Sequence, residues 1–382
     1  MRIGHKKILL KEVATFLNGY AFKPSDWSKE GLPIIRIQNL TGTNRDFNYY
    51  NGNYNKKYLV ENGDILISWS ASLGIFLWEN MTGILNQHIF KVIFDKNIEI
   101  DKIYFLHCMK FLIKKIEKNI HGSTMKHITR PEFEKIKFPI YEIDIQRKIS
   151  KKLIFITKII ENNKKLLNKM EELSKSLFTR MFGDIKTNDK NWEIKKLGEV
   201  VQTQYGTSKK ATSIVGKFPI LRMNNITYSG EMDYKDLKYI ELSDSEKEKF
   251  LLKKGELLFN RTNSKELVGK TGLFNLDIPM AFAGYLIRIK PSNLIHSKFL
   301  LFFMNSEFMK KLLYNKAKNI VGMANINAKE LEDFSIILPP IELQNKFAER
   351  TEKIEKLKFE IEKSIEIAQN LYDSLISKYF DN

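Results

Sequence analysis

Apolar residues recur at alternating spacings of four and three in two separate stretches of the chain. The first stretch carries Ile149, Leu153, Ile156, Ile160, Leu167, Met170 and Leu177. The second stretch carries Ile354, Ile361, Ile365, Ala368 and Leu375. This spacing places the apolar residues on one face of a helix, and over several heptads it is typical of a coiled coil. The sequence therefore predicts two long helices, each with an apolar seam.

Polar residues interrupt both seams, which bears on how the helices pair. Asn163 lies in the first seam, and Thr351 and Lys358 lie in the second. Because a polar seam residue selects register and partner, we expect the two helices to form an antiparallel coiled coil with each other. The alternative is two separate amphipathic helices, each packed on its own globular part.

The remaining segments alternate short apolar runs with turn residues, which predicts strands. These runs cover residues 33–37, 64–69, 88–94, 219–223, 256–259 and 285–289. Shorter helices are expected at 103–117 and 298–314. The predicted fold class is α+β, with two similar globular domains joined by the long helices. We place the domains at 1–142 and 185–340 and the helical spacers at 143–184 and 341–382.

The chain repeats itself once. The segment PIIRIQNL at 33–40 matches PILRMNNI at 219–226, and Gln146 matches Gln344. The offset is 186 residues at the first pair and 198 at the second, where it stays constant to the end. Each half therefore has a variable front and a back of fixed length, which predicts a pseudo-two-fold internal repeat.

The charge of the chain narrows the class of partner. Lys and Arg number 63 against 45 acidic residues, which leaves a net charge of +18. Such an excess favours a polyanionic partner, either nucleic acid or an acidic membrane. No apolar run approaches the roughly 20 residues needed to span a bilayer, and the start does not resemble a signal peptide. With the single cysteine Cys108, these features predict a cytoplasmic protein without a membrane partner.

An ordered set of short phrases carries a resemblance to a known family. The phrases lie at 197–200, 219–226, 254–261, 268–272, 281–288 and 339–344, and the first half holds a variant of the same scheme. In this order, twice over, they resemble the specificity (S) subunit of type I restriction–modification systems across essentially the whole chain. The first half departs from the scheme at 68–74, where it lacks the Asn-Arg and Gly-Lys pairs of the second half.

The resemblance implies two target-recognition domains, each of which reads one short half of a bipartite DNA site. It implies that the helices act as a spacer and dock two methyltransferase subunits, and that translocase–nuclease subunits join the assembly. It further implies that the S chain has no active site and needs no cofactor, so S-adenosylmethionine, ATP and Mg²⁺ are expected only on the partner subunits. At 1.5 Å per residue, a helix over 145–182 spans roughly 57 Å. We therefore expect an unread spacer of less than about 12 base pairs.

Two segments come close to known catalytic motifs but do not match them. Residues 264–271 approach a phosphate-binding loop but have Ser264 in place of its first glycine, and residues 338–341 lack the polar and aromatic residues of an amino-methyltransferase loop. The histidines show no zinc-binding spacing, so we expect no catalytic residue and no metal site. Two alternatives stay open, a stand-alone restriction or modification enzyme and a coiled-coil adaptor or RNA-binding scaffold.

Candidate DNA contacts follow from side-chain chemistry. Arg bonds the guanine edge with two donors, Asn and Gln do the same for adenine, and Lys suits phosphate. The candidates in the second half are Gln204, Tyr205, Lys209, Arg261, Asn263, Ser264, Lys265, Lys270 and Asn325. Those in the first half are Ser68, Ser70, Ser72, Gln87, His88, Ser123 and Lys126. Solvated loops or local turn bonds are the alternative for most of them. Arg36 and Arg222 are expected inside strands, in structural ion pairs.

Overall fold

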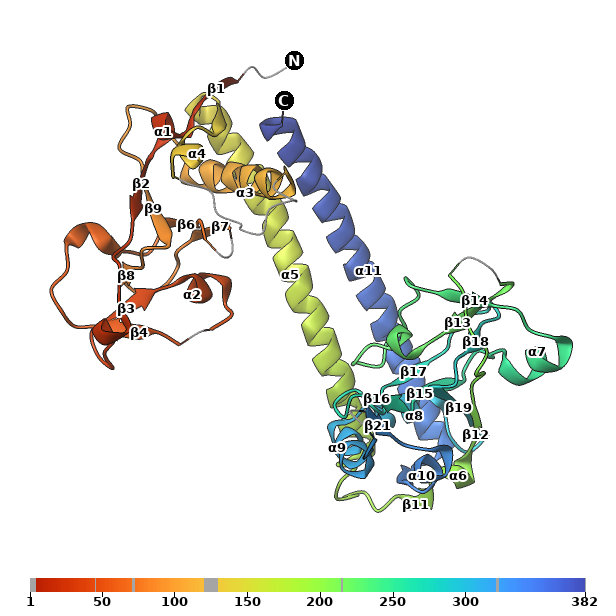
Figure 1. The fold of residues 1–382 in the computed structure, drawn as a ribbon. Coiled ribbons are helices and arrows are strands. Elements are labelled where there is room, and N and C mark those ends of the chain that lie inside the picture. Colours follow the sequence, from red (N-terminus) through yellow and green to blue (C-terminus); the bar gives the residue numbers. More distant parts are fainter. Residues whose placement is uncertain are drawn as a thin grey trace. The chain divides into compact units, whose positions relative to one another are not determined.

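The computed structural model describes residues 5–44, 46–70, 73–119, 130–213, 216–320 and 323–381. These residues form two compact units, unit 1 with Met1–Lys164 and Glu362–Asn382, and unit 2 with Lys165–Ile361. The division crosses both long helices, α5 (Ile143–Phe182) and α11 (Ile341–Phe380) (Figure 1). Each unit therefore contains one end of each long helix.

Unit 1 is a mixed α+β unit. Its sheets have the strand orders β2-β9-β6-β7, β4-β3-β8-β5 and β1-β10. The strands are β1 (Lys6–Leu9), β2 (Thr15–Asn18), β3 (Leu32–Ile35), β4 (Asn48–Tyr50), β5 (Leu59–Val60), β6 (Ile65–Ser68), β7 (Gly74–Leu77), β8 (Gly83–Leu85), β9 (Ile89–Ile93) and β10 (Lys137–Ile140). The shorter helices are α1 (Leu10–Val13), η1 (Pro24–Asp26), α2 (Ile37–Thr41), η2 (Lys56–Tyr58), α3 (Lys102–Asn119) and α4 (Arg130–Glu134).

Unit 2 follows the same plan. Its sheets have the orders β12-β19-β15-β17, β14-β13-β18, β11-β22 and β16-β21-β20. The strands are β11 (Glu193–Lys196), β12 (Val201–Tyr205), β13 (Phe218–Leu221), β14 (Lys238–Ile240), β15 (Leu257–Asn260), β16 (Thr262–Asn263), β17 (Thr271–Leu273), β18 (Ala281–Phe282), β19 (Leu286–Pro291), β20 (Lys318–Ile320), β21 (Met323–Asn325) and β22 (Ser335–Leu338). The shorter helices are α6 (Leu197–Val200), η3 (Met223–Asn225), α7 (Asp244–Phe250), α8 (Ser297–Met304), α9 (Glu307–Lys316) and α10 (Ala328–Glu332).

The two units share most of their strand pairings. In each, the first strand pairs antiparallel with the last strand before a long helix, β1 with β10 and β11 with β22. The sheets β2-β9-β6-β7 and β12-β19-β15-β17 are both fully antiparallel, and β9 and β19 hold the same place in them. Each unit also contains one parallel pair, β3 with β8 and β13 with β18. The internal repeat in the sequence is thus a repeat of structure.

In unit 1, the two long helices pack against each other in opposite directions. Ile156 and Ile160 of α5 form a buried cluster with Ala368 of α11. Closer to the middle of both helices, Asn163 Nδ2 donates to Ser364 Oγ at 3.0 Å. Higher residue numbers in α5 therefore meet lower numbers in α11. Asn163 is the polar seam residue that the sequence singled out, and its hydrogen bond fixes the register of the pair.

Unit 2 shows the same pairing at the other ends of the helices. Phe182 of α5 packs on Phe347 of α11 with ring centroids 5.2 Å apart, and both belong to the core of the unit. Lys358 lies 3.7 Å from Glu171 and 3.3 Å from Glu231. The predicted antiparallel coiled coil is confirmed, and the alternative of two separately packed helices is wrong.

The predicted seam positions are buried or half-buried throughout. Ile149, Leu153, Ile156, Ile160, Ile354 and Ala368 are buried, whereas Leu167, Met170, Leu177, Ile361, Ile365 and Leu375 are half-buried. The half-buried positions are spread along both helices, from Leu167 near the middle of α5 to Leu177 and Leu375, five residues before the helix ends.

Two local predictions were wrong in detail. The helix expected at 298–314 is broken into α8 and α9, because Ser306 caps the second helix by accepting a hydrogen bond from the Met309 N–H at 3.1 Å. Asn305 strengthens the break by donating to the carbonyl groups of Thr271 and Leu301. The segment 316–327 is not among the predicted strands, but it includes the hairpin strands β20 and β21.

Candidate nucleic-acid interface

Part of the predicted site lies directly after β6 and β15, inner strands of the sheets β2-β9-β6-β7 and β12-β19-β15-β17. Directly after β6, the Trp69 N–H donates to the carbonyl group of His88 at 3.5 Å. Directly after β15, the Arg261 N–H donates to the carbonyl group of Tyr285 at 3.0 Å. Trp69 and Arg261 therefore occupy equivalent places in the two units. The same backbone arrangement, called the frame below, therefore carries an indole in unit 1 and a guanidinium in unit 2.

A glycine in each unit brings a second strand against this edge. A Cβ atom added to Gly19 would lie 2.2 Å from the carbonyl oxygen of Asn86, and one added to Gly206 would lie 2.2 Å from that of Ala283. No side chain fits at such distances, so the close backbone approach requires glycine at both positions. Both glycines directly follow a strand, β2 in unit 1 and β12 in unit 2.

In unit 2, an arginine and two tyrosines share the edge. The Arg261 guanidinium lies 4.8 Å from the centre of the Tyr205 ring, a cation–π contact. The Tyr205 hydroxyl accepts a hydrogen bond from the Ala328 N–H at 2.8 Å, which holds the ring in place. Tyr205 and Tyr285 are 42% and 54% exposed. A planar cation is thus held at the surface, in the chemical form that bonds guanine with two donors.

Asn260, directly before Arg261, is a buried polar residue whose side-chain amide makes no hydrogen bond among the described residues. Its side chain is fully buried, and neither its amide nitrogen nor its amide oxygen has a hydrogen-bond partner among the described residues. Burying an amide without partners costs roughly 1–3 kcal/mol, so such a group marks a functional place or stored strain. On the other side of Arg261, Asn263 Oδ1 accepts from the Ser264 N–H at 2.9 Å, a local turn bond.

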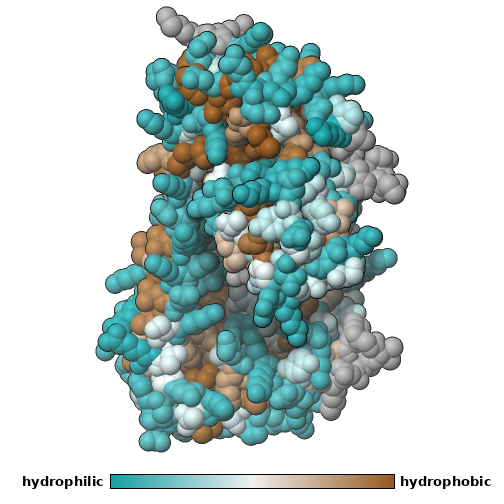
Figure 2. Space-filling view, turned by 90° about the vertical axis from the view of Figure 1, so that its left-hand side faces the viewer, coloured by the Kyte–Doolittle hydropathy of each residue, from teal (hydrophilic) through white to brown (hydrophobic). Residues whose placement is uncertain are grey.

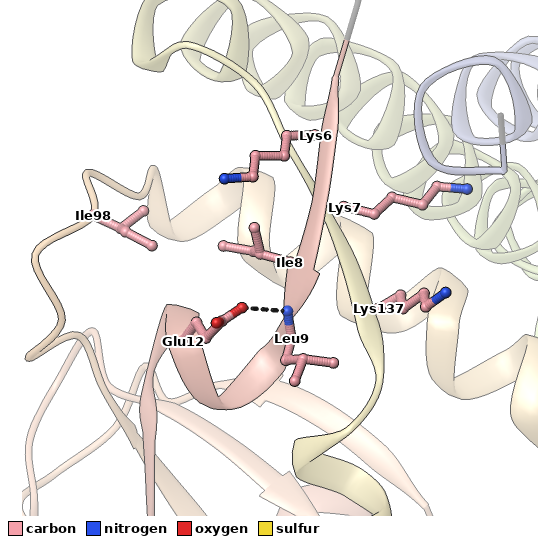
Figure 3. A pocket seen from close by; sticks show the side chains of 7 residues that line it. All are labelled: Lys6, Lys7, Ile8, Leu9, Glu12, Ile98 and Lys137. Carbon is pink, nitrogen blue, oxygen red and sulfur yellow. Dashed lines mark hydrogen bonds between the residues drawn. The ribbon is translucent and has the colours of Figure 1, made fainter.

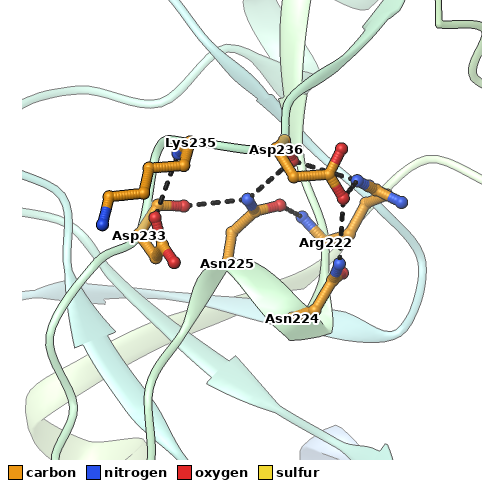
Figure 4. Close-up of polar contacts among 6 residues, drawn as sticks. All are labelled: Arg222, Asn224, Asn225, Asp233, Lys235 and Asp236. Atoms are coloured by element: carbon orange, nitrogen blue, oxygen red, sulfur yellow. Dashed lines mark hydrogen bonds and ion pairs between the residues drawn. The ribbon is translucent and has the colours of Figure 1, made fainter. Parts of the chain in front are cut away.

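A hydrogen-bonded network shapes the loop after β13 (Figure 4). Asn225 Oδ1 accepts from the Arg222 N–H at 2.9 Å, and Asn225 Nδ2 donates to the carbonyl groups of Asp233 and Asp236. The Arg222 side chain pairs with the Asp236 carboxylate at 2.8 Å. The loop is therefore tied to itself by one asparagine and one ion pair.

Unit 1 repeats half of this network. Asn39 Oδ1 accepts from the Arg36 N–H at 3.0 Å, but the Arg36 guanidinium lies over the Trp27 ring at 5.4 Å. Both arginines directly follow a strand and precede a short helix, so their expected position inside strands was wrong. The expected ion pair exists for Arg222, whereas the contact given for Arg36 is with an aromatic ring.

Comparisons with known proteins agree with this doubled architecture. A family model described as the type I restriction modification DNA specificity domain matches residues 4–172 and again residues 189–369. The chain belongs to this family.

Among known members, the specificity subunit of the type I restriction enzyme EcoBI from Escherichia coli is 24% identical over 409 residues, 98% of this chain and 85% of that protein. The MjaVIII specificity subunit of Methanocaldococcus jannaschii is 27% identical over 324 residues, 79% of this chain and 75% of that protein. The crystal structure of an S subunit from M. genitalium matches with a TM-score of 0.62 at 15% identity, covering 99% of this chain and 96% of that one. That likeness supports the shared fold.

Membership in the type I specificity family decides the class of function. The chain is a DNA specificity subunit and not itself an enzyme. Specificity subunits of this family bind DNA and assemble with modification and restriction subunits. The adaptor and RNA-scaffold alternative is not favoured. Within the described residues, no helix is long and apolar enough to cross a membrane, and no group of three or more His, Cys, Asp or Glu residues could hold a metal ion.

The sequence predicted that Lys270 contacts DNA, and the structure contradicts this prediction. The side chain is buried, and its Nζ donates to the carbonyl groups of Met223 at 3.0 Å and Ile226 at 2.5 Å. Burial also lowers the pKa of Lys270 below its ordinary value. The lysine ties β17 to the loop after β13, so its charge serves the fold.

Two further candidates of unit 2 use their polar groups internally. Gln204 accepts a hydrogen bond from Arg288 and donates to the carbonyl group of Lys249 at 2.7 Å. Asn325 Oδ1 accepts from the Thr262 hydroxyl at 2.9 Å. These internal hydrogen bonds hold neighbouring strands and loops together. They agree with the alternative that such residues make local bonds and do not contact DNA.

Two lysines of the same unit remain at the surface. Lys209 forms an ion pair with Glu246 at 2.6 Å, and this hydrogen bond is the main reason that the pKa of Glu246 falls to about 2. Lys265 lies over the ring of Tyr314, with Nζ 4.5 Å from the ring centre. Lys265 is therefore held by an aromatic face, whereas the charge of Lys209 is already compensated.

The candidates of unit 1 divide into three groups. Ser68 and Ser70 are buried, at 0% and 7% exposure, so their prediction as direct DNA contacts was wrong. Gln87 Nε2 lies 3.2 Å from His88 Nε2. His88 is exposed, and its ring lies 5.7 Å from the Trp69 ring between centroids. The remaining predicted residues, Ser72, Ser123 and Lys126, lie outside the described residues.

An aromatic cluster in unit 1 had not been identified from the sequence. The Tyr20 ring lies 4.8 Å from Phe22 and 5.7 Å from Tyr58, and Phe22 lies 5.1 Å from Tyr50. Lys57 lies over the Tyr58 ring at 4.9 Å. Aromatic rings with an adjacent cation are a common surface for nucleic acid. The concentration of aromatic residues at 47–58 was the available signal.

A pocket of about 350 Å³ lies beside β1, away from these edges (Figure 3). Lysines contribute much of its lining, but Lys6 and Lys7 point to opposite sides of the strand. The carboxylate of Glu12 accepts a hydrogen bond from the Leu9 N–H at 2.8 Å. Because the ammonium groups diverge and the carboxylate is engaged, the pocket offers no converging set of groups.

Proposed function

We propose that this specificity subunit reads a bipartite DNA sequence, one short half with each unit, separated by base pairs that it does not read. The observation that carries the proposal is the equivalent placement of Trp69 and Arg261. Two copies of one frame that present unlike side chains suit two different short sequences. A single continuous sequence would not require the frame to be duplicated.

Unit 2 supplies the clearest base-reading chemistry. Arg261 is the residue we assign to a base edge, because its guanidinium is positioned by Tyr205 and is preceded by the unsatisfied amide of Asn260. In unit 1, the corresponding assignment is to Gln87 and His88 beside Trp69, with the aromatic cluster near Tyr20 as an accompanying surface. Surface lysines contact phosphates and set the salt dependence of binding.

The two long helices act as the spacer between the half-sites. Each has 40 residues, which at 1.5 Å per residue corresponds to about 60 Å. The hydrogen bond between Asn163 and Ser364 and the packing of Phe182 on Phe347 oppose sliding of one helix along the other. A helix pair of fixed register supports a fixed number of unread base pairs.

The helices also provide a place for two copies of one partner. Leu173 and Leu371 are separated by the 198-residue offset of the repeat and are 48% and 50% exposed, Leu173 in unit 2 and Leu371 in unit 1. Figure 2 shows that hydrophobic residues reach the surface among hydrophilic ones on the face that it draws. We assign these two positions to two methyltransferase subunits, because equivalent surfaces bind equivalent partners.

Translocase–nuclease subunits complete the proposed assembly. S-adenosylmethionine, ATP and Mg²⁺ belong to the partner subunits, and the assembly acts in the cytoplasm on double-stranded DNA. The chain itself contributes sequence selection and geometry.

The test is to map methylated bases in cells that contain the methyltransferase subunits, with and without this chain. We expect methylation of two short sequences with an unread gap, and only when the chain is present. Methylation of one continuous sequence, or an unchanged pattern without the chain, would refute the proposal.

A further inference from the structure

Besides Arg261, unit 2 contains a lysine-rich pocket of about 310 Å³ between the loop after β16 and helix α9. Four of its eight lining residues are lysines, Lys265, Lys270, Lys310 and Lys311, and one is acidic, Glu266. Of the four, Lys270 is engaged by two backbone carbonyl groups. The lining of the pocket therefore retains three other lysines and one glutamate.

Aromatic rings hold two of these ammonium groups. Lys265 Nζ lies 4.5 Å from the centre of the Tyr314 ring. Lys310 Nζ lies 4.0 Å from the centre of the Tyr228 ring and donates to the Tyr228 carbonyl group at 2.8 Å. A ring face orients a cation without neutralising it, whereas a carboxylate would do both. The charges are thus positioned and remain available.

The positive charge in the pocket is not compensated by ion pairs. Among the described residues, no ion pair involves Lys265, Lys310 or Lys311. Burial, together with the charge of Lys175, lowers the pKa of Lys310, and only Glu307 acts in the opposite direction. An anion in the pocket would relieve this unfavourable placement of positive charge.

We propose that this pocket binds a phosphate group, supplied by the DNA backbone beside the half-site that unit 2 reads. The inference rests on the proposed function, because DNA is the source of the phosphate. Lysine suits phosphate as a point charge with several donors. Lys265 lies four residues after Arg261, with the two-residue strand β16 between them, so one short segment links the base-reading side chain to the phosphate pocket. That link favours DNA over a free phosphate compound.

The experiment measures how the affinity of the full-length chain, in its methyltransferase complex, for a random-sequence duplex depends on salt. The variants are Lys265→Gln, Lys310→Gln and the double variant. Each neutralised phosphate contact contributes about −0.9 to the slope of log affinity against log salt concentration. We expect each single variant to lose about one unit of slope and the double variant about two. Affinity should fall equally for random and target duplexes.

Two matched variants control the experiment. Lys186→Gln removes one exposed charge of unit 2 outside the pocket and should leave the slope unchanged. Replacing both pocket lysines by arginine (Lys265→Arg with Lys310→Arg) retains the charges and should retain most of the slope. An unchanged slope in the double glutamine variant would overturn the inference. A loss of slope that the arginine variant shares would indicate damage to the fold and would also count against it.

A titration with tripolyphosphate distinguishes the source of the phosphate. If tripolyphosphate binds the wild-type complex and not the double glutamine variant, while the DNA slope is unchanged, then the assignment to DNA is wrong and the pocket takes a free phosphate compound. Methylation mapping separates this inference from the proposed function. A bipartite target found together with an unchanged slope refutes only the pocket.

Discussion

Gln146 of α5 and Gln344 of α11 make the same three hydrogen bonds, each within its own unit. Gln146 Oε1 accepts from the Asp101 N–H at 3.0 Å, and its Nε2 donates to the carbonyl groups of Glu99 at 3.1 Å and Tyr141 at 2.8 Å. The side chain is fully buried. It joins the first turn of the long helix to the start of α3 and to the strand end before the helix.

Gln344 repeats the arrangement in unit 2. Its Oε1 accepts from the His296 N–H at 2.8 Å, and its Nε2 donates to the carbonyl groups of Leu294 at 3.2 Å and Pro339 at 2.8 Å. It is also fully buried. The constant offset in the sequence thus corresponds to a constant joint between helix and globule.

The joint can be tested with Gln146→Leu and Gln344→Leu. Each substitution removes three hydrogen bonds and leaves buried backbone groups without partners, so we expect a loss of about 2–4 kcal/mol in the free energy of unfolding, measured in urea. Gln369→Leu, at an exposed position of α11, is the control and should change stability by less than about 0.5 kcal/mol. Losses below about 1 kcal/mol in both joint variants would contradict the assignment.

Gly206→Ala tests the close backbone approach beside Arg261. The added Cβ would lie 2.2 Å from the Ala283 carbonyl oxygen, so the strand end must move. We expect a loss of stability of about 2 kcal/mol or more and weaker recognition of the half-site of unit 2. Gly284→Ala is the matched control, because its Cβ would meet its nearest atom at 3.4 Å. Equal effects of the two substitutions, by thermal unfolding, would show that the approach does not matter.

Much of the fold could be predicted because its signals are periodic. The seam around Ile156 and the polar residue Asn163 gave the helix pair and its direction. The break between α8 and α9 escaped prediction, because the apolar run at 299–304 continues into helix-favouring residues. In the structure, Ser306 caps α9, and Asn305 adds a tertiary hydrogen bond to the Thr271 carbonyl group that the local sequence does not reveal.

The candidate site was harder to predict than the fold, for a physical reason. Lys270 and Arg261 are both cationic residues on one segment, but Lys270 is turned inward to backbone carbonyl groups and Arg261 lies at the surface over Tyr205. Residue type alone does not determine which of the two faces solvent. Asn260 lies within the phrase at 254–261 but was not predicted as a site residue, because its missing hydrogen-bond partners become visible only in three dimensions.

Arg261→Gln tests base reading by unit 2. Loss of a two-donor contact should cost about 1–3 kcal/mol of discrimination at one base pair of that half-site. Competition binding against duplexes with single base changes provides the measurement. The other half-site serves as the internal control and should keep its discrimination. A uniform loss over all sequences would assign Arg261 to a phosphate instead.

Leu173→Asp and Leu371→Asp test the proposed methyltransferase surfaces. Each places a charge on one of two equivalent apolar positions, so each single variant should hold one methyltransferase subunit and the double variant none. Native mass measurement of the assembly reports the number bound. Leu294→Asp, at an exposed leucine outside the long helices, should leave two bound. Retention of two subunits by the double variant would place the docking surface elsewhere.

The most direct test of the account lengthens both helices together. Four residues inserted after Asn163 and four after Lys363 add about 6 Å, and they rotate the helix by about 40° beyond one full turn. One base pair rises about 3.4 Å and turns by roughly 35°, so the added length and rotation correspond to one or two base pairs. Insertion in α5 alone is the control, and it should destabilise the protein because it breaks the register set by Asn163 and Ser364. Methylation mapping of the doubly lengthened chain should find both half-sites unchanged and the gap between them longer by one or two base pairs. An unchanged gap in a stably folded variant would contradict the central claim that the paired helices set the distance between the two recognised sequences.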